Sequence, residues 1–492
     1  MIPFHFLKDM NKRIFLIVTI QFILVTVSGK ITLPNYLASN MVMQQQSNVI
    51  ISGSSDRLNH TISVFSSWNK QKLLAKTDSK GYFRVSLKTP SAGGPYTIII
   101  NDGDQLTLEN ILIGEVWLCA GQSNMEMPMR GFDRQPLIGA NEIISKAKPR
   151  TPIRMFVTDS EDGHWIRQYS KTPQFDIKGK WLDNAPENVA VCSATAYYFA
   201  CYLQEVLEVP VGVMVTTLGG ARIEPFMSRE ALQPFNKVRY MERLDGEIKE
   251  GDAYNVPTLL FNAKIHPLTA LPIRGFLWYQ GESNRDNADR YSDLMTAMVK
   301  DWRQRWNSPE APFYFVEIAP YNYEGADGTS AAFLREAQMQ AAHKIRNCGI
   351  VSTLDIGAPN FIHPVDKKTV GDRLALLALA QTYHHEGFGY ACPQYKSMEI
   401  KDGKIYINLE NAGNGPCPMW TSLKGFEIAG DDQIFYPAFA EVETKTCRLA
   451  VSNVKVPHPV AVRYCFKNYA EASVFNISGL PLHPFRTDNW DK

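Results

Sequence analysis

The chain has 492 residues, which is long for a single hydrophobic core and predicts two or three domains. Its hydrophobic share of 45% and charged share of 21% are ordinary for a folded protein, and the net charge of +1 gives no electrostatic reason to expect an acidic partner. No Lys/Arg-rich run interleaved with aromatic residues occurs in the sequence, which argues against a nucleic-acid-binding protein.

Residues 1–29 resemble a secretory signal peptide. Lys12 and Arg13 precede an apolar run at 14–27, and small residues follow it. The run is shorter than the roughly 20 apolar residues of a membrane-spanning helix, and Gln21 interrupts it. We therefore expect a signal peptide rather than a membrane anchor, and a secreted or periplasmic protein with no membrane segment once the signal is removed.

Residues 30–110 carry short alternating runs separated by Gly, Asp, Ser and Pro turns, a pattern typical of a small β-sandwich or barrel. From residue 111 to 388, Val/Ile-rich strands alternate with amphipathic helices, which predicts a parallel sheet covered by helices on both faces. The predicted strands are 115–120, 211–218, 274–279, 312–318 and 349–354, and the predicted helices are 193–207, 288–306, 330–347 and 367–382. Residues 150–190 and 225–262 are less regular and are interpreted as insertions.

The β pattern returns in residues 389–492, where an Asp402-Gly403 hairpin signal separates two alternating runs. The eight cysteines form no CxxC or Cys/His cluster, so we expect no structural zinc site. Secretion would permit disulfides among the last four, at 392, 417, 447 and 465, but we expect free thiols.

Four polar segments follow predicted strands of the α/β region, where ligands bind in open parallel sheets. They are Gly121-Gln-Ser-Asn124, Gly219-Gly220, Gly281-Glu-Ser-Asn284 and Ile362-His363-Pro364. Taken alone, a serine after a Gly-Gln turn usually serves only to stabilise the turn, and a lone His-Pro usually has a structural role. Four such segments on one edge of a sheet instead indicate a site.

The residue types in these segments fit acyl transfer. Ester hydrolysis needs a nucleophile, a base within hydrogen-bond reach, and donors that face the developing oxyanion. Ser123 can attack a carbonyl and His363 can take its proton. The predicted oxyanion donors are the backbone N–H groups of Ser123 and of the Gly219-Gly220 turn, together with the side chain of Asn284.

These blocks, with the long motifs GQSNMEMPM and WYQGESN, resemble the SGNH hydrolase superfamily and, within it, the sialate O-acetylesterase family of carbohydrate esterases. The resemblance implies a flavodoxin-like three-layer α/β/α core, no metal or organic cofactor, and an acetylated sugar or glycan as substrate. It implies the same roles for Ser123, Gly219 or Gly220, Asn284 and His363. We expect Gln122, Asn124 and Glu282 to support the loops or contact substrate.

The acid of the triad departs from the superfamily pattern. Many members carry an Asp three residues before the histidine, where this chain has Asn360. Asp355, Asn360, a backbone carbonyl or no charged group could orient His363, and we expect Asp355. The sequence also admits two other functions. One is a non-catalytic carbohydrate-binding protein built on an SGNH core that has lost its acid. The other is a thioesterase or lipase, for which the sequence shows no evident apolar run near the motifs.

Overall fold

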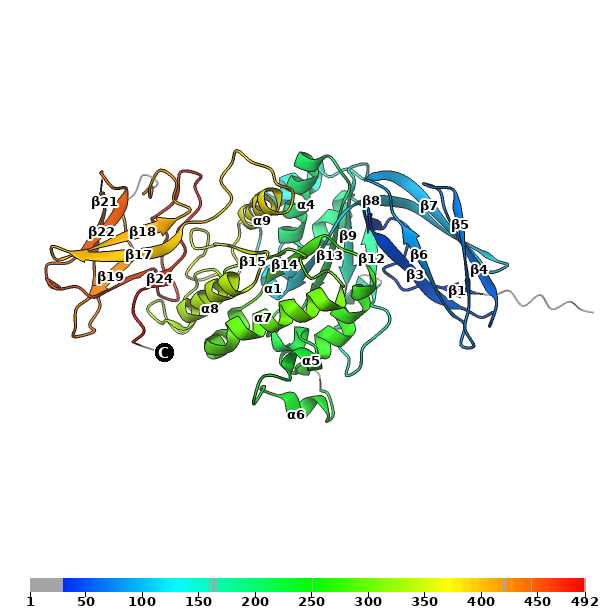
Figure 1. Ribbon diagram of the computed structural model, residues 1–492, viewed down its shortest axis with the longest axis horizontal. Helices are drawn as coiled ribbons and strands as arrows, with labels where there is room; N and C mark the ends of the chain where they lie inside the picture. The colour runs from blue at the N-terminus through cyan, green and yellow to red at the C-terminus, as the bar shows by residue number, and fades with distance from the viewer. Residues whose placement is uncertain are drawn as a thin grey trace, which may run out of the picture.

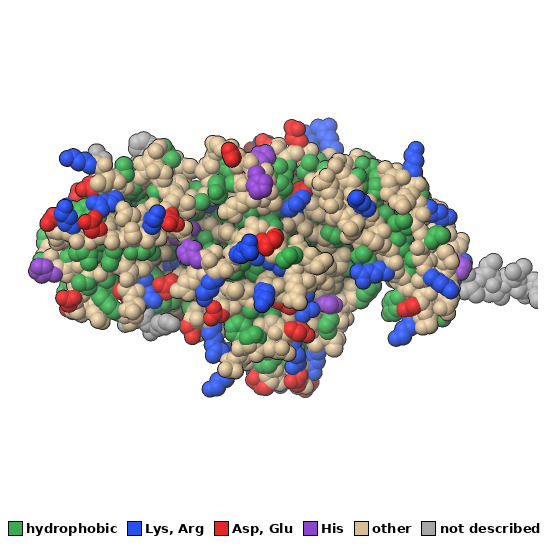
Figure 2. Space-filling view, viewed as in Figure 1, with side chains coloured by type: hydrophobic (Ala, Val, Ile, Leu, Met, Phe, Trp, Pro, Cys, Tyr) green, Lys and Arg blue, Asp and Glu red, His purple; other side chains and the backbone are tan. Residues whose placement is uncertain are grey.

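The computed structural model describes residues 30–490 except 159, 162, 163, 166, 250, 419–421 and 444, so the predicted signal peptide lies outside the described residues. The chain forms three lobes arranged in a row in sequence order (Figure 1). β-Rich lobes at the two ends flank a central α/β lobe that contains the long helices. Acidic and basic side chains are interspersed on the face shown in Figure 2.

The N-terminal lobe consists of two sheets. One has the order β1-β3-β6, and the other contains β2, β4, β5, β7 and the first part of β8. In β3 and β6 every second side chain is buried, as expected for strands with one face on a core. The strands are β1 (Ile31–Thr32), β2 (Val42–Gln44), β3 (Asn48–Ser55), β4 (Thr61–Ser66), β5 (Gln71–Lys76), β6 (Tyr82–Lys88), β7 (Gly93–Asn101) and β8 (Gln105–Gly121).

Strand β8 joins the N-terminal lobe to the central lobe without a break. Its first part pairs with β7 and β2, and its last part pairs in parallel with β13 and β14. The boundary predicted between residues 110 and 111 therefore falls inside one 17-residue strand. The two lobes share this strand rather than a linker.

The central sheet has the order β12-β9-β13-β8-β14-β15-β16, and all neighbours are parallel except the edge pair β12–β9. The predicted strands near residues 211, 274, 312 and 349 are confirmed as β13 (Val211–Thr217), β14 (Gly275–Tyr279), β15 (Phe313–Val316) and β16 (Cys348–Val351). The interpretation of 150–190 as an insertion is wrong for β9 (Ile153–Thr158), which lies inside the sheet next to β12 (Gly179–Leu182). A short buried strand has no alternation that would mark it in the sequence.

Helices cover both faces of this sheet. The four predicted long helices are confirmed as α4 (Ala194–Leu207), α7 (Ala288–Arg305), α8 (Ser330–Lys344) and α9 (Lys367–Gln381). Helix α4 packs against α9, and α7 packs against α8. In β8, Trp117 and Cys119 belong to the apolar cluster that contains α4 and α9, whereas Val116 and Leu118 belong to the cluster that contains α7 and α8. Since alternate strand residues face opposite ways, the two helix pairs lie on opposite faces.

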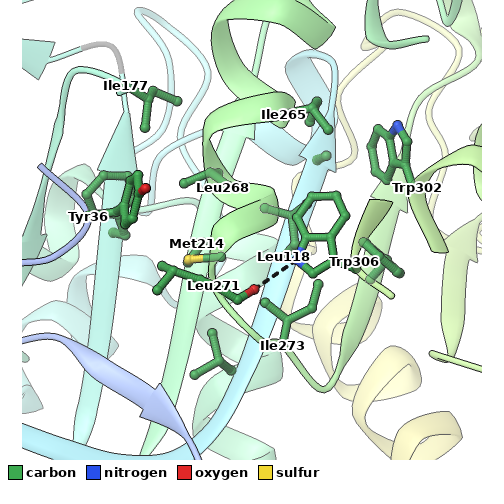
Figure 3. Packing of buried hydrophobic residues seen from close by; sticks show 14 of the residues in the cluster. Tyr36, Leu118, Ile177, Met214, Ile265, Leu268, Leu271, Ile273, Trp302 and Trp306 are labelled. Carbon is green, nitrogen blue, oxygen red and sulfur yellow. Dashed lines mark hydrogen bonds between the residues drawn. The ribbon is translucent and has the colours of Figure 1, made fainter. Parts of the chain in front are cut away.

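The apolar cluster that contains α7 and α8 extends from the central lobe into the N-terminal lobe. Figure 3 shows Leu118 and Met214 from the sheet beside Leu268 and Leu271, with Tyr36 of the N-terminal lobe at one side. These side chains are almost fully buried. Burial of this kind stabilises by about 25 cal/mol per Å² of apolar surface, so the cluster fixes the N-terminal lobe on the central one.

The C-terminal lobe has two four-stranded antiparallel sheets, ordered β17-β18-β22-β21 and β20-β19-β23-β24. The predicted Asp402-Gly403 hairpin is confirmed between β17 (Gln394–Lys401) and β18 (Lys404–Glu410). All eight cysteines are free. Within the described ranges no helix is long and apolar enough to cross a bilayer. The remaining strands are β19 (Phe426–Ala429), β20 (Tyr436–Pro437), β21 (Phe439–Glu443), β22 (Arg448–Ser452), β23 (Ala461–Tyr464) and β24 (Phe485–Arg486).

Candidate active site

Ser123 lies where β8 ends at the carboxyl edge of the sheet and the short helix α1 (Ser123–Glu126) begins. The preceding Gly121 has a φ of 144°, and a Cβ there would lie 2.2 Å from the Tyr279 carbonyl oxygen of β14. Only glycine fits this close approach of two backbones. The tight passage fixes the direction in which the chain leaves the sheet, and with it the position of Ser123.

Gln122 joins this turn to the loop after β14. Its side-chain oxygen accepts hydrogen bonds from the N–H groups of Gly281 and Ser283, at 3.2 and 3.4 Å. Its own N–H donates to the Tyr279 carbonyl at 3.1 Å. Gln122 is buried, so these contacts hold two of the four predicted segments together.

The structure brings Ser123 and His363 into hydrogen-bond contact. The Nε2 atom of His363 lies 2.8 Å from Ser123 Oγ, although the two residues are 240 positions apart. On the other side of the ring, Nδ1 lies 2.7 Å from the side-chain oxygen of Gln135. Phe132 packs edge-on against the imidazole, with ring centroids 5.3 Å apart. If Nδ1–H donates to Gln135, the Nε2 lone pair faces the serine hydroxyl, which is the arrangement of a general base.

The expectation that Asp355 orients His363 is wrong. Both carboxylate oxygens of Asp355 accept hydrogen bonds from Arg373 of helix α9, at 2.6 and 2.8 Å. Arg373 is buried, and a buried guanidinium needs a counter-charge. Asn360, the other candidate, lies on the surface. Gln135 is the residue that contacts His363 Nδ1. The sequence analysis missed it because nothing in the sequence marks an uncharged residue in an irregular loop as the partner of a histidine.

His363 lies in an environment that favours its neutral form. Burial, reinforced by the nearby positive charge of Lys367, lowers the pKa of His363 to about 4. An amide oxygen at Nδ1 offers no negative charge that would offset this effect. The imidazole is therefore neutral and able to accept a proton at all but acidic pH.

Of the predicted oxyanion donors, the structure leaves two open. The Gly219 N–H donates to the Glu126 carboxylate at 2.6 Å and is occupied. Over the described residues, the N–H groups of Ser123 and Gly220 have no hydrogen-bond acceptor, and both residues line one cavity. A Cβ at Gly219 would lie 3.2 Å from Glu126 Oε1, so a larger residue here would crowd the carboxylate that accepts this N–H.

The structure does not make Asn284 an open donor. Its side-chain oxygen accepts hydrogen bonds from the Ile223 N–H and the Gln280 amide, and its nitrogen donates to Glu224 at 3.0 Å. The residue is fully buried. These contacts correct the predicted role: Asn284 holds the loop after β14 from beneath instead of facing the cavity.

Asn124 connects the turn that carries Ser123 to the loop that carries His363. Its side-chain nitrogen donates to the Glu282 carboxylate at 2.6 Å and to the Ile362 carbonyl at 3.2 Å, and its oxygen accepts a hydrogen bond from Lys367 Nζ. Burial raises the pKa of Glu282 and lowers that of Lys367 to about 7. Ile362 precedes His363 directly, so Asn124 sets the position of His363 relative to Ser123.

Ser123 opens into a cavity of about 590 Å³ at the carboxyl edge of the sheet, and most of the residues that line it are polar or charged. Its lining includes Gln122, Gly220, Glu282, Ser283, Arg285 and Glu324. This lining suits a hydroxylated substrate, and no cluster of three or more metal-binding side chains occurs in the part of the chain that the structure describes. The arrangement can present a serine, a neutral base and two N–H donors to an ester carbonyl.

Comparison with known proteins agrees with this geometry. Residues 113–379 match the family described as carbohydrate esterase, sialic acid-specific acetylesterase. The chain is 25% identical to the sialate O-acetylesterase of Mus musculus over 92% of this chain and 93% of that protein, and 26% identical to that of Rattus norvegicus over 76% and 78%. A solved carbohydrate acetylesterase from Xanthomonas citri is 32% identical, with a TM-score of 0.83 over 94% of this chain and 100% of that one. The chain therefore belongs to the sialic acid-specific acetylesterase family of carbohydrate esterases and is a carboxylic ester hydrolase.

Proposed function

We propose that this esterase removes O-acetyl groups from carbohydrates through an acetyl-enzyme formed on Ser123. The observation that carries the proposal is the continuous contact from Ser123 Oγ through the His363 ring to Gln135, with distances of 2.8 and 2.7 Å. The open N–H groups of Ser123 and Gly220 beside the nucleophile support it.

In the first half of the reaction, Ser123 Oγ attacks the acetyl carbonyl while His363 Nε2 takes the hydroxyl proton. The oxyanion of the tetrahedral intermediate accepts hydrogen bonds from the N–H groups of Ser123 and Gly220. The C–O bond to the sugar then breaks, and the His363 imidazolium gives its proton to the departing sugar oxygen. Gln135 accepts the Nδ1–H throughout and keeps the ring in one orientation.

In the second half, a water molecule attacks the acetyl-enzyme carbonyl and His363 takes one of its protons. The tetrahedral intermediate collapses, the Ser123 oxygen leaves and regains a proton from His363, and acetate is released. No step needs a metal or organic cofactor, in line with the cofactor-free chemistry that the resemblance implies.

The proposal includes the architecture of the core, the class of substrate and the place where the protein acts. The central lobe is a three-layer SGNH core, which the helix pairs on opposite faces of the parallel sheet support. The substrate is an acetylated sugar or glycan, as the polar cavity suggests. The protein acts in the periplasm or outside the cell, for which the sequence pattern of residues 1–29 is the support.

The test measures acetate release from acetylated sialic acid, xylan and pectin, together with covalent labelling by a fluorophosphonate. We expect the wild-type protein to release acetate and to be labelled at Ser123, and Ser123→Ala to lose both. Ser145→Ala, which changes an exposed serine of helix α2 (Ala140–Lys146), is the matched control. Acetate release that persists in Ser123→Ala would overturn the mechanism, and a wild-type protein that neither reacts nor releases acetate would favour a non-catalytic carbohydrate-binding protein.

A further inference from the structure

A second large groove lies away from Ser123, at the junction of the N-terminal and central lobes. Its volume is about 840 Å³. One wall comes from β3 and β6, and the other from the segment around Phe175 and the short helix η4 (His266–Ala270). In Figure 2 the outline of the molecule is notched between these two lobes, and basic side chains lie on both sides of the notch.

This groove is at the opposite end of the central sheet from the active site. Helix η4 comes just before β14 in the chain, so it lies at the amino-terminal edge of that parallel strand. Ser123 lies at the carboxyl edge, where β8 ends. The residues that line the groove differ from those that line the Ser123 cavity, so the two are separate.

Two aromatic rings stand exposed in the groove. Tyr82 of β6 and Phe175 of the central lobe are 53% and 54% exposed, and their ring centroids are 6.3 Å apart. Folding gains nothing from leaving such rings in water, and exposed apolar groups gathered in a concave site mark a binding surface. Sugar rings present C–H groups on their faces, and these stack on aromatic side chains.

The groove also carries an excess of positive charge in its wall. Lys76 and Arg84 are exposed in its wall and, among the described residues, form no ion pair. Asp78 also lines the groove, and its Oδ1 accepts the N–H groups of Lys80 and Tyr82; its single negative charge is outnumbered by the two positive charges of Lys76 and Arg84. Two open cations beside two aromatic rings complement a sugar that bears a carboxylate.

We propose that this groove is a second, non-catalytic glycan-binding site, which holds an acidic segment of a glycan chain. Tyr82 and Phe175 stack on sugar rings, and Lys76 and Arg84 pair with the carboxylates of uronic or sialic acid units. The proposal rests on the proposed function only for the class of ligand, since a carbohydrate esterase acting on a polymer gains from holding the chain outside its active site.

The experiment is affinity gel electrophoresis of the full-length protein in gels that contain polygalacturonate, polysialic acid or, as a neutral polymer, hydroxyethylcellulose. We expect an acidic polymer to retard the wild-type protein. The double variant Tyr82→Ala/Phe175→Ala should bind about tenfold more weakly, since two stacking contacts are lost. Leu74→Ala removes an apolar side chain of the N-terminal lobe that is 67% exposed and lies outside the groove, and it is the matched control. An unfolding curve of each variant shows whether it is folded.

Retardation by an acidic polymer that the double variant loses and Leu74→Ala keeps would support the proposal, whichever acidic polymer is bound. Retardation by the neutral polymer alone, equal retardation of wild type and double variant, or no retardation would overturn it. Hydrolysis of p-nitrophenyl acetate by the wild-type protein is measured in parallel. Loss of that activity would count against the proposed function, whereas loss of polymer binding counts against the groove.

Discussion

Replacement of Gln135 by Glu tests the role of this residue most directly. The change keeps the length of the side chain and puts a carboxylate where an amide oxygen now lies 2.7 Å from His363 Nδ1. An opposite charge at this distance raises the pKa of a histidine by about 1–3 units. The pKa of His363 is about 4, so the variant should have a value of about 5–7.

The assay is the pH dependence of kcat/KM with p-nitrophenyl acetate. In the proposed mechanism the neutral imidazole is the base, so we expect activity to fall as the pH drops through the pKa of His363. For the wild type we expect this fall near pH 4, and for Gln135→Glu we expect it at a pH 1–3 units higher. At pH 8 the variant should be faster by up to about tenfold, since a charge-assisted hydrogen bond stabilises the imidazolium that forms in the reaction.

Gln233→Glu is the matched control, because it adds the same charge at an exposed position. Circular dichroism at each pH separates loss of activity from acid unfolding. Two results would refute the assignment of Gln135 as the partner of His363. One is a fall of the wild-type kcat/KM near pH 6.5, and the other is a fall at the same pH in wild type and Gln135→Glu.

Three other substitutions have distinct expected outcomes. Asp355→Asn should lower the free energy of unfolding by about 1–3 kcal/mol, because Arg373 loses its counter-charge. It should leave kcat/KM within about twofold of the wild type. A loss of about 10⁴-fold in kcat/KM would instead indicate that Asp355 is the acid of a catalytic triad. Asn124→Ala should lower kcat/KM by about 10²-fold through misplacement of the base, with substrate binding less affected; single-turnover kinetics measures this, and an unchanged rate would contradict it. His483 lies 3.1 Å from the Glu317 carboxylate, and although burial opposes its charge, Glu317 raises the pKa of His483 to about 10. A raised pKa stabilises the folded state fully below the unfolded value of about 6.5, and the contribution is lost as the pH rises through about 10, so denaturant unfolding should show this decline in the wild type but not in His483→Gln.

Much of the central lobe could be predicted from the sequence because its elements are long and regular. The helix predicted over 193–207 begins within one residue of its predicted start, where the Ser193 hydroxyl oxygen accepts the Ala196 N–H and caps the helix. Strand β9 was missed because a six-residue run that is buried on both faces has no polar alternation. The predicted boundary at residue 110 lies within β8, because a composition change marks where the core changes and not where a strand ends.

Some residues of the candidate site could likewise be predicted from the sequence, and others could not. The contact between Ser123 and His363 could be predicted because their segments follow strands and their side chains form a distinctive pair. The partner of His363 could not, since contact across 228 positions between a histidine and an uncharged glutamine depends on how an irregular loop folds. Asn284 has a motif position that indicates an oxyanion donor, but only the surrounding side chains show that its amide is already engaged.

The continuity of β8 has a consequence for how this protein can change over evolution. A strand of 17 residues spans about 55 Å, and the same backbone that completes a sheet of the N-terminal lobe carries Ser123 at its end. Insertion of one residue between Gly114 and Trp117 would turn Trp117 and Cys119 to the wrong face of the sheet and displace Ser123. The N-terminal lobe therefore cannot be exchanged or deleted as a detachable module, and its spacing from Ser123 is inherited with the strand that carries this residue.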